Sequence, residues 1–339
     1  MIEKTTLIQI AEAAGVSLST VDRVLNRRGG VSSDAREKVL MWAGRLNIDR
    51  VIYRDDLRLL RIAVIMQSAT NPFYKGLQEA FIEMNNVMQE FKLSFFIHYF
   101  DVADAMIATS KITQISASYD AVIIISPDDP RLSESLSIIS KRIPVVTMVT
   151  DLPDSGRIAY IGPDNRQIGR VAGELMGRFL GPPGGEIIIV LGMQRFVGHD
   201  EREMGFRSVL QERFATCSIF SKLESGEDRE RAGRLVYEAL KSNPAVRGIY
   251  NVSDGNLEIA HAINALGLKE RIVLITHELT PERRAMLCEG AIDAIIDQNP
   301  RQEARRALEV LCAHFKRTNV ELPSATFTEF NIFIRESCQ

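Results

Sequence analysis

The sequence TLIQIAEAAGVSLSTVDRVLN, residues 6–26, predicts two short helices joined by a tight turn. Thr6 and Gln9 have the spacing of a capping box, in which each side chain accepts a hydrogen bond from the other residue's backbone N–H. Gly15 can adopt the positive φ that a tight corner needs, and Ser17 can cap the second helix. The pattern therefore favours an all-helical start to the chain.

The spacing of small and branched residues in this stretch is typical of a helix-turn-helix. Leu7 opens the first helix, and Ala11, Gly15 and Val21 are the fifth, ninth and fifteenth residues counted from it. A small residue lets the helices touch, glycine makes the corner, and a branched apolar residue locks the second helix. The second helix, about Ser17–Asn26, then projects far enough to enter the DNA major groove. An ordinary three-helix bundle without DNA is the alternative.

A third helix is expected after a basic, flexible loop at Arg27–Gly30. Ser32 can cap this helix, which runs over about Ser33–Leu46. Residues 1–61 carry 11 Lys and Arg against 8 Asp and Glu, whereas the remaining chain carries 30 against 36. A mildly basic head thus precedes an acidic body, which fits a head that meets phosphate. The apolar side chains that complete a small core are Val39, Leu40, Trp42, Ala43 and Leu46.

Two kinds of sequence segment alternate along the chain after residue 61. Short apolar, β-branched runs end in Gly, Pro, Asn or Asp, and amphipathic stretches follow them. This alternation predicts βα units with parallel strands that are buried on both faces. About 280 residues of it exceed one sheet of typical size, so we expect two similar α/β lobes. The predicted strands are Arg61–Gln67, Leu93–Tyr99, Ala121–Ser126, Pro144–Val149, Glu186–Leu191, Gly248–Val252, Ile272–Thr276 and Ala294–Asp297.

Several function classes are disfavoured by what the sequence lacks. Apolar runs stay below the roughly 20 residues of a membrane helix, and Met1–Thr6 leads into a polar segment without the apolar core of a secretory signal. We therefore expect a cytoplasmic protein with no membrane partner. The four cysteines form no CxxC pair, which argues against a disulfide framework or a zinc site. The chain has no HExxH, GxxxxGK or GxSxG motif, so we expect no enzyme, no metal and no cofactor.

The head resembles a family of regulators at specific residues. Its pattern is Thr6-Leu7-x3-Ala11-Glu12-x-Ala14-Gly15-Val16-Ser17-x2-Thr20-Val21-x-Arg23-Val24-x-Asn26, followed by Val31-Ser32 and Arg36-Glu37-Lys38-Val39. This pattern is similar to that of the lactose-repressor/galactose-repressor family of bacterial transcription regulators, and the match is dense over residues 5–47. The body resembles the effector domain of that family, which is related to type I periplasmic sugar-binding proteins.

The resemblance implies a fold class and a division of the chain. A helix-turn-helix domain of three helices precedes a two-lobed α/β domain, which is like a type I periplasmic binding protein and is built of doubly wound parallel sheets. The expected parts are a DNA-binding head at 1–48, a hinge at 49–61 and an effector-binding domain at 62–339. The expected lobes of that domain are about 62–162 with 298–324, and 163–297 with 325–339.

The resemblance also implies which head residues meet DNA. Leu18, Ser19 and Arg23 hold the positions that read base edges, and the Arg23 guanidinium can form two hydrogen bonds with guanine O6 and N7. Other polar residues hold positions that contact phosphates and set the register without reading sequence. These residues are Thr6, Ser17, Thr20, Asn26 and Ser32.

Two positions depart from the family. Asp22 stands where a small hydroxyl is usual, so it either reads a cytosine amine, points away, or pairs with Arg27 or Arg28, and we favour the pairing. Leu57 matches a leucine that enters the minor groove in family members. The surrounding Tyr53–Asp56 does not follow the family's small-residue pattern, so packing of Leu57 between head and body is an equal alternative.

Ligands of open α/β sheets bind beyond the carboxyl ends of the strands, and polar and aromatic residues gather there in this sequence. Carboxylates, amides, an arginine and aromatic faces suit a polyhydroxylated ring. Taken singly, an Asp after a strand is often only a helix N-cap. Val149, Ser253 and His277 depart from residues common in related sugar-binding domains, so the ligand's identity stays open. The expected effector-binding residues are Asn71, Phe73, Tyr74, Asp129, Arg202, Asp254, Glu278 and Gln298.

The sequence as a whole favours a sequence-specific, DNA-binding transcription regulator that acts as a repressor. A homodimer should bind a roughly palindromic double-stranded operator, and the absence of a leucine heptad after Phe333 favours a dimer over a tetramer. The expected effector is a sugar or sugar derivative that binds between the two lobes. The alternatives are a solute-binding module of the periplasmic sugar-binding type without a regulatory role, and an α/β enzyme with an added regulatory head.

Overall fold

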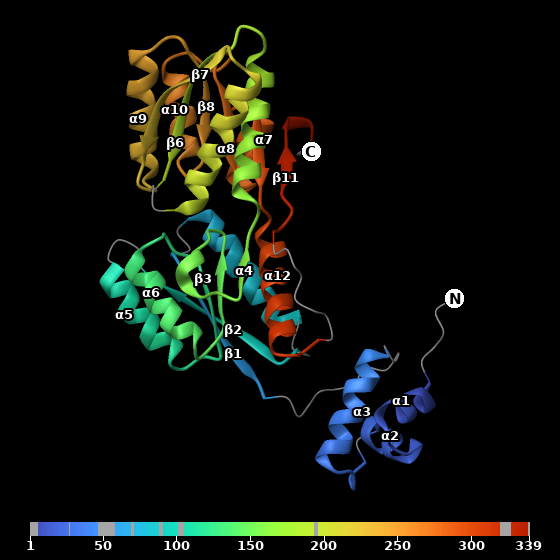
Figure 1. The fold of residues 1–339 in the computed structure, drawn as a ribbon. Coiled ribbons are helices and arrows are strands. Elements are labelled where there is room, and N and C mark those ends of the chain that lie inside the picture. The colour runs from blue at the N-terminus through green and yellow to red at the C-terminus, as the bar shows by residue number, and fades with distance from the viewer. Residues whose placement is uncertain are drawn as a thin grey trace. The chain divides into compact units, whose positions relative to one another are not determined.

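The computed structural model describes most of the chain and is shown as a ribbon in Figure 1. It contains two compact units, one with the three N-terminal helices and the other with both β-sheets. Within the part of the chain that the structure describes, no helix is both long enough and apolar enough to cross a membrane. The described residues are 6–26, 28–46, 58–68, 71–87, 91–100, 105–192, 196–318 and 327–337.

Three helices form the head: α1 (Leu7–Ala14), α2 (Leu18–Leu25) and α3 (Ser33–Arg45). The predicted capping box is confirmed at the start of α1. The Thr6 hydroxyl accepts a hydrogen bond from the backbone N–H of Gln9, whose side-chain oxygen accepts one from the backbone N–H of Thr6 at 2.8 Å. These bonds satisfy two donors that a helix start otherwise leaves without partners.

The turn between α1 and α2 is built as its spacing predicts. Gly15 has a φ of 65°, and its N–H donates to the carbonyls of Ala11 and Glu12. The Ser17 hydroxyl accepts a hydrogen bond from the Thr20 N–H at 3.1 Å and so caps α2. The core of the head is formed by Ile10, Ala11, Ala14, Val21, Val24, Val39 and Ala43, with Leu40, Trp42 and Leu46 packed against it.

The first α/β lobe is built on a parallel five-stranded sheet with the order β2-β1-β3-β4-β5. Helices α5 (Ala105–Ser116) and α6 (Pro130–Ser140) cover one face of this sheet with apolar side chains, and α4 (Pro72–Val87) packs against β2. The strands are β1 (Leu60–Met66), β2 (Leu93–Tyr99), β3 (Ala121–Ile124), β4 (Val145–Met148) and β5 (Ala159–Ile161).

The second lobe is built on a six-stranded sheet with the order β11-β10-β9-β8-β6-β7. Its strands are β6 (Gly185–Leu191), β7 (Cys217–Glu224), β8 (Val246–Asn251), β9 (Val273–His277), β10 (Ala294–Asp297) and β11 (Asn331–Phe333). The helices that follow β5 in the chain are α7 (Asn165–Leu180), α8 (Val197–Arg213), α9 (Arg229–Ser242), α10 (Asn256–Ala265), α11 (Pro281–Cys288) and α12 (Pro300–His314).

The second sheet is buried on both faces. Ile187 and Ile189 of β6 pack in one core with apolar side chains of α7 and α8. Ile188 and Val190, which alternate with them, pack in another core with side chains of α9, α10 and α11. Because successive side chains of a strand point to opposite faces, this continuous apolar run can fill two cores at once.

The eight predicted strands are all present, with ends that differ by at most two residues, so the expected two-lobed α/β class is confirmed. The prediction missed β5, β7 and β11. Strand β7 lies at a sheet edge and alternates buried and exposed residues, whereas continuous apolar runs were the predictive signal. Strands β5 and β11 have only three residues each. Strand β11 also runs antiparallel to β10, so the expectation of wholly parallel sheets is wrong at this edge.

Candidate functional site

A cavity of about 70 Å³ is bounded by segments that follow the strands of both sheets. Seven of the eight predicted effector-binding residues line it, and they come together at the edge where the carboxyl ends of the parallel strands meet. The lining residues are Asn71, Phe73, Tyr74, Val149, Thr150, Phe196, Gly198, His199, Arg202, Glu227, Val252, Ser253, Asp254, Glu278, Arg283 and Gln298.

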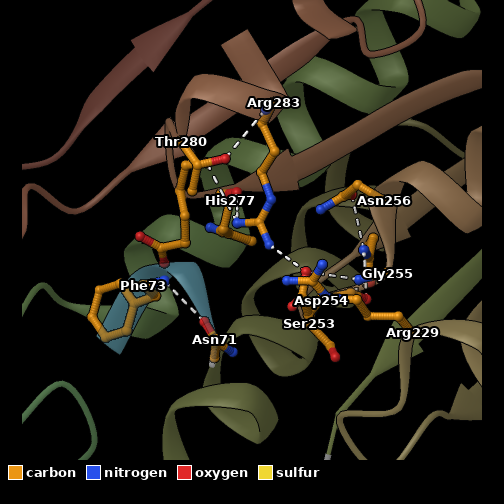
Figure 2. A network of polar contacts seen from close by, with 12 residues as sticks. Asn71, Phe73, Arg229, Ser253, Asp254, Gly255, Asn256, His277, Thr280 and Arg283 are labelled. Carbon is orange, nitrogen blue, oxygen red and sulfur yellow. Dashed lines mark hydrogen bonds and ion pairs between the residues drawn. The ribbon is translucent and has the colours of Figure 1, made fainter. Parts of the chain in front are cut away.

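The first lobe supplies an aromatic wall to this cavity. Phe73 and Tyr74 lie in the first turn of α4 and are both buried, with ring centroids 5.4 Å apart in an edge-to-face arrangement. The Asn71 side-chain oxygen accepts a hydrogen bond from the Phe73 backbone N–H at 2.9 Å, which fixes the loop that presents the rings (Figure 2). Aromatic faces of this kind pack against the C–H face of a polyhydroxylated ring.

The eighth predicted residue, Asp129, is not among the lining residues. It is the N-cap of α6 and accepts a hydrogen bond from the Arg131 backbone N–H at 3.0 Å. Its carboxylate also forms an ion pair with the Arg131 guanidinium at 3.0 Å. The structure therefore places Asp129 in the capping role that is common for an acidic residue after a strand.

Arg202 is the centre of a polar network on the second lobe's side of the cavity. It projects from α8, it is only 4% exposed, and its Nε donates to the Asn165 side-chain oxygen at 2.8 Å. Its Nη2 donates to the Gln298 side-chain oxygen at 3.1 Å. Asn165 was not predicted, because the three-residue strand before it, β5, was not predicted. The network holds a buried cation through neutral oxygens, so its charge is available to a ligand.

Asp254 is held by two arginines, and neither arginine was predicted. Its carboxylate oxygens accept hydrogen bonds from Arg283 at 2.9 Å and from Arg229 at 2.8 Å. Figure 2 shows the Arg283 guanidinium, from α11, directed at Asp254. Burial opposes ionisation of Asp254, but the two guanidinium groups outweigh it and lower the pKa of its carboxyl. Asp254 is therefore ionised at neutral pH, and the two guanidinium groups balance its negative charge.

Glu278 and Glu227 present two further carboxyls to the cavity. Glu278 has a φ of 64°, which a non-glycine residue adopts only at a cost of about 1–3 kcal/mol and mostly at functional sites. Its Oε1 accepts a hydrogen bond from the Gln298 side-chain N–H at 2.6 Å, whereas its Oε2 is buried and has no hydrogen-bond partner among the described residues. Glu227, in the loop between β7 and α9, also has a φ of 64° and was not predicted.

Two of the residues that depart from the related sugar-binding pattern have structural partners. His277 is buried, and its Nε2 lies 2.9 Å from the Tyr250 hydroxyl. Burial and nearby Arg202 lower the pKa of His277 well below its usual range, so its imidazole is neutral. Val149 has a φ of 66°, and its carbonyl accepts hydrogen bonds from the Tyr160 hydroxyl and the Asn165 amide. These positions support the walls of the cavity.

The two glutamates make the stability of this domain depend on pH. Burial, reinforced by Asp254 for Glu227 and by Asp297 for Glu278, raises the pKa of each carboxyl to about 7 from an ordinary value of 4.5. The folded state therefore binds more protons than the unfolded state between these values, and the stability that protonation provides is lost as pH rises towards 7.

We expect thermal unfolding to show this loss between pH 5 and pH 8. Replacement of both Glu227 and Glu278 by Gln should make the loss of unfolding free energy between pH 5 and pH 8 smaller by about 1–2 kcal/mol, after allowance for screening by solvent. The matched control is Glu238→Gln, which removes an exposed carboxylate on α9. An unchanged pH profile in the double variant would show that these carboxyls ionise normally.

The head presents a separate polar surface along α2. Leu18, Ser19 and Arg23, the predicted base-reading residues, are exposed, whereas Val21 and Val24 face the core. Positions 19 and 23 lie one turn apart on one face of the helix, and position 18 is its first residue, next to position 19. The predicted phosphate contacts Thr6, Ser17, Asn26 and Ser32 are also exposed, and Thr20 is partly exposed.

Asp22 pairs with an arginine, as we favoured. Its carboxylate accepts hydrogen bonds from Arg28 at 3.1 Å and from the Asn26 amide at 2.6 Å. Pairing moderates the repulsion that a free carboxylate would exert on DNA phosphate. Arg27 and Leu57 lie outside the described residues.

Comparisons with known proteins assign both parts of the chain. Residues 6–47 match the family described as bacterial regulatory proteins, lacI family, and residues 62–318 match the periplasmic binding protein domain. The chain belongs to the periplasmic binding protein domain family and carries a lacI-family regulatory domain. The helix-turn-helix and the two-lobed architecture of the chain are thus those that the resemblance implied.

Curated relatives divide between the two parts of the chain. The HTH-type transcriptional regulator DegA of Bacillus subtilis is 35% identical over 83 residues, and the alignment spans only 24% of this chain and 25% of DegA. The ribose operon repressor of Bacillus subtilis is 36% identical over 77 residues, which are 21% of this chain and 23% of that protein. The D-ribose/D-allose-binding protein of Pseudomonas aeruginosa is 23% identical over 78% of this chain and 87% of its own length.

Solved structures match the fold of the effector domain. GanP, a glucose-galactose binding protein from Geobacillus stearothermophilus, has a TM-score of 0.73 at 21% identity, covering 83% of this chain and 99% of GanP. A solute-binding protein from Burkholderia graminis, solved with D-arabinose, has a TM-score of 0.75 at 21% identity, covering 82% of this chain and 96% of its own. These likenesses establish the two-lobed fold.

Proposed function

We propose that this sugar-responsive, DNA-binding regulator is a cytoplasmic, homodimeric repressor that has no enzymatic activity. The observation that carries the proposal is the lacI-family match at residues 6–47 in a chain that also matches a periplasmic binding protein domain. Residues 1–48 are the head, 49–61 the hinge and 62–339 the effector-binding domain. Two heads, one from each protomer, contact the two halves of a palindromic operator.

In this proposal, the exposed face of α2 reads the operator. Arg23 contributes most to sequence preference, because a guanidinium can form two hydrogen bonds with a guanine edge. Leu18 and Ser19 add an apolar contact and a hydroxyl. The remaining contacts hold phosphates and set the register, and Leu57 belongs to the hinge. The phosphate-contacting residues are Thr6, Ser17, Thr20, Asn26 and Ser32.

The effector is a carbohydrate held in the cavity between the lobes. Asn71, Phe73 and Tyr74 contact it from one lobe, and a polar set contacts it from the other. Ribose and allose in the names of the matching proteins support a sugar of the aldose class. A ligand that binds the closed arrangement of the lobes better than the open one shifts the equilibrium between them, and this coupling controls DNA binding. The polar set comprises Arg202, Asp254, Glu278 and Gln298.

A solute-binding module without a regulatory role is the second candidate. The similarity of residues 62–318 to transport-related binding proteins favours it. The lacI-family segment, with its exposed α2 face, favours the regulator, because a module that only binds solute has no use for such a face.

Selection from random double-stranded DNA tests the proposal. The intact protein should enrich a sequence with two inverted half-sites, and its affinity for that sequence should fall steeply as salt rises, because phosphate contacts release counterions. Enrichment of no common sequence, or binding that ignores salt, would contradict a DNA-binding function and favour the solute-binding module.

A further inference from the structure

The strongest feature that the proposed function leaves unexplained is an excess of carboxyls over cations in the effector cavity. Three carboxyls line it, on Glu227, Asp254 and Glu278, against the guanidinium groups of Arg202 and Arg283. Arg283 is already engaged by Asp254, which Arg229 contacts as well. Arg202 has neutral partners, so at most one carboxyl is balanced by it.

The carboxyls of Glu227 and Glu278 have no cationic partner of their own among the described residues. Among the residues that the structure describes, no lysine or arginine forms an ion pair with Glu227 or Glu278. Arg283 donates to the backbone carbonyl of Glu278 at 3.4 Å and not to its carboxylate. The buried Oε2 of Glu278 lacks any hydrogen-bond partner in this part of the chain. A buried acceptor without a partner is costly, so a donor from a ligand is expected to reach it.

The chain makes specific room for the Glu227 carboxylate. Gly192 follows β6, and a Cβ built on it would lie 1.6 Å from Glu227 Oε1. Any other residue at this position would displace the carboxylate from the cavity wall. Glu227 Oε2 is 3.5 Å from the Ser253 hydroxyl, its one hydrogen-bond contact among the described side chains. The positive φ of Glu227 also shows that its backbone is held in a costly conformation to present this group.

The carboxyls of Glu227 and Glu278, whose pKa values burial raises, ionise fully at neutral pH only when positive charge is near, and a neutral sugar supplies none. A neutral ligand that displaces water from them increases their desolvation without adding charge, and it therefore favours protonated carboxyls. A ligand that carries an ammonium group offers several charged donors to oxygens that lack them, and charge-assisted hydrogen bonds are the strong ones. The aromatic rings of Phe73 and Tyr74, which line the same cavity, also tolerate a cation nearby.

We infer that the effector is a polyhydroxylated ligand with a protonated amino group, held by the carboxylates of Glu227 and Glu278. This inference rests on the proposed function, because it names the class of carbohydrate that the same cavity selects. Glu227 is the specificity-determining residue. Arg283 balances Asp254 and Arg202 can balance one further carboxyl, so the carboxylate of Glu227 is the one left without a balancing cation among the described lining residues. Sugar phosphates and sugar acids are disfavoured by the same excess of negative charge.

Calorimetric titration of the intact protein with matched sugars tests the inference at about pH 7. The amines are D-glucosamine, D-galactosamine and D-mannosamine, and each is compared with its neutral parent and its N-acetyl derivative. At least one amine should bind about tenfold more tightly than both neutral counterparts, the ratio expected for one charge-assisted hydrogen bond. In Glu227→Gln this ratio should fall to about one, with Glu278→Gln as a second variant.

Glu238→Gln is the matched control, because it removes an exposed carboxylate of the same lobe outside the cavity, and it should keep the tenfold ratio. Tighter binding of the neutral parents, or an unchanged ratio in both cavity variants, would overturn this inference and leave the carbohydrate effector standing. Failure of every sugar in the panel to bind, and of D-ribose and D-allose titrated beside them, would overturn both.

Discussion

Replacement of Gly205 by alanine should destabilise the effector domain by about 3 kcal/mol, or about 6–12 °C in melting temperature. Gly205 lies in α8 where this helix crosses α7, and a Cβ built on it would lie 2.1 Å from the Arg166 carbonyl oxygen. The obstacle is the backbone of α7, which cannot turn aside as a flexible side chain can. Gly169 of α7 is restricted in the same way from the other helix, because its Cβ would lie 2.0 Å from the Arg202 carbonyl oxygen of α8.

Gly205→Ala should also weaken ligand binding, because α8 would have to move and Arg202 projects into the cavity from this helix. Differential scanning calorimetry of Gly205→Ala measures the effect. Gly76→Ala is the control, because Gly76 lies within α4 and its Cβ would be 3.8 Å from the nearest atom, on Pro300. This variant should be neutral or slightly stabilising, as alanine favours helix over glycine. Equal melting temperatures for the two variants would contradict the close α7–α8 packing.

Replacement of Val21 by aspartate should abolish specific operator binding. Val21 is fully buried between the helices of the head, and the head is too small to tolerate a buried charge, because a core of this size leaves little stability to lose. Loss of the folded head should lower operator affinity by about 100-fold or more, because it removes the sequence-specific contacts and leaves only non-specific binding. The effector domain should melt as in the parent protein.

A fluorescence-anisotropy titration of operator DNA measures this loss. Met41→Asp provides the control, because Met41 is 41% exposed on α3 and the same charge is introduced where water can solvate it. That variant should retain most of its affinity. If Val21→Asp bound operator like Met41→Asp, the three-helix core would not be what presents α2.

The fold could be predicted where local pattern and burial agree. Gly15 and Ser17 indicate a turn and a cap by their own chemistry, and the buried strands β1, β6 and β9 are nearly continuous apolar runs. Strand β7 gave no such signal, because an edge strand with one exposed face has alternating polar residues. Its existence depends on pairing with β6, a contact that no local pattern encodes.

The site was predicted where position after a strand is the determining feature. Asn71, Asp254 and Gln298 lie within five residues after a strand end and line the cavity. Asn165 was missed because the three-residue strand before it, β5, was not predicted, and Arg283 because it lies in α11 without a feature that marks it. Only the tertiary fold brings them to Arg202 and Asp254. Asp129 has the same sequence signature as Asp254, yet it caps α6. The two roles differ in what packs nearby, which the sequence around each aspartate does not reveal.

Reading of base pairs by Arg23 on α2 can be measured in the Arg23→Ala variant. The affinity of Arg23→Ala for the selected operator is compared with its affinity for random DNA of the same length, at fixed salt. The variant should lose about 1–3 kcal/mol of operator binding, while its affinity for random DNA changes far less. An operator preference equal to that of the parent protein would show that Arg23 does not read base pairs.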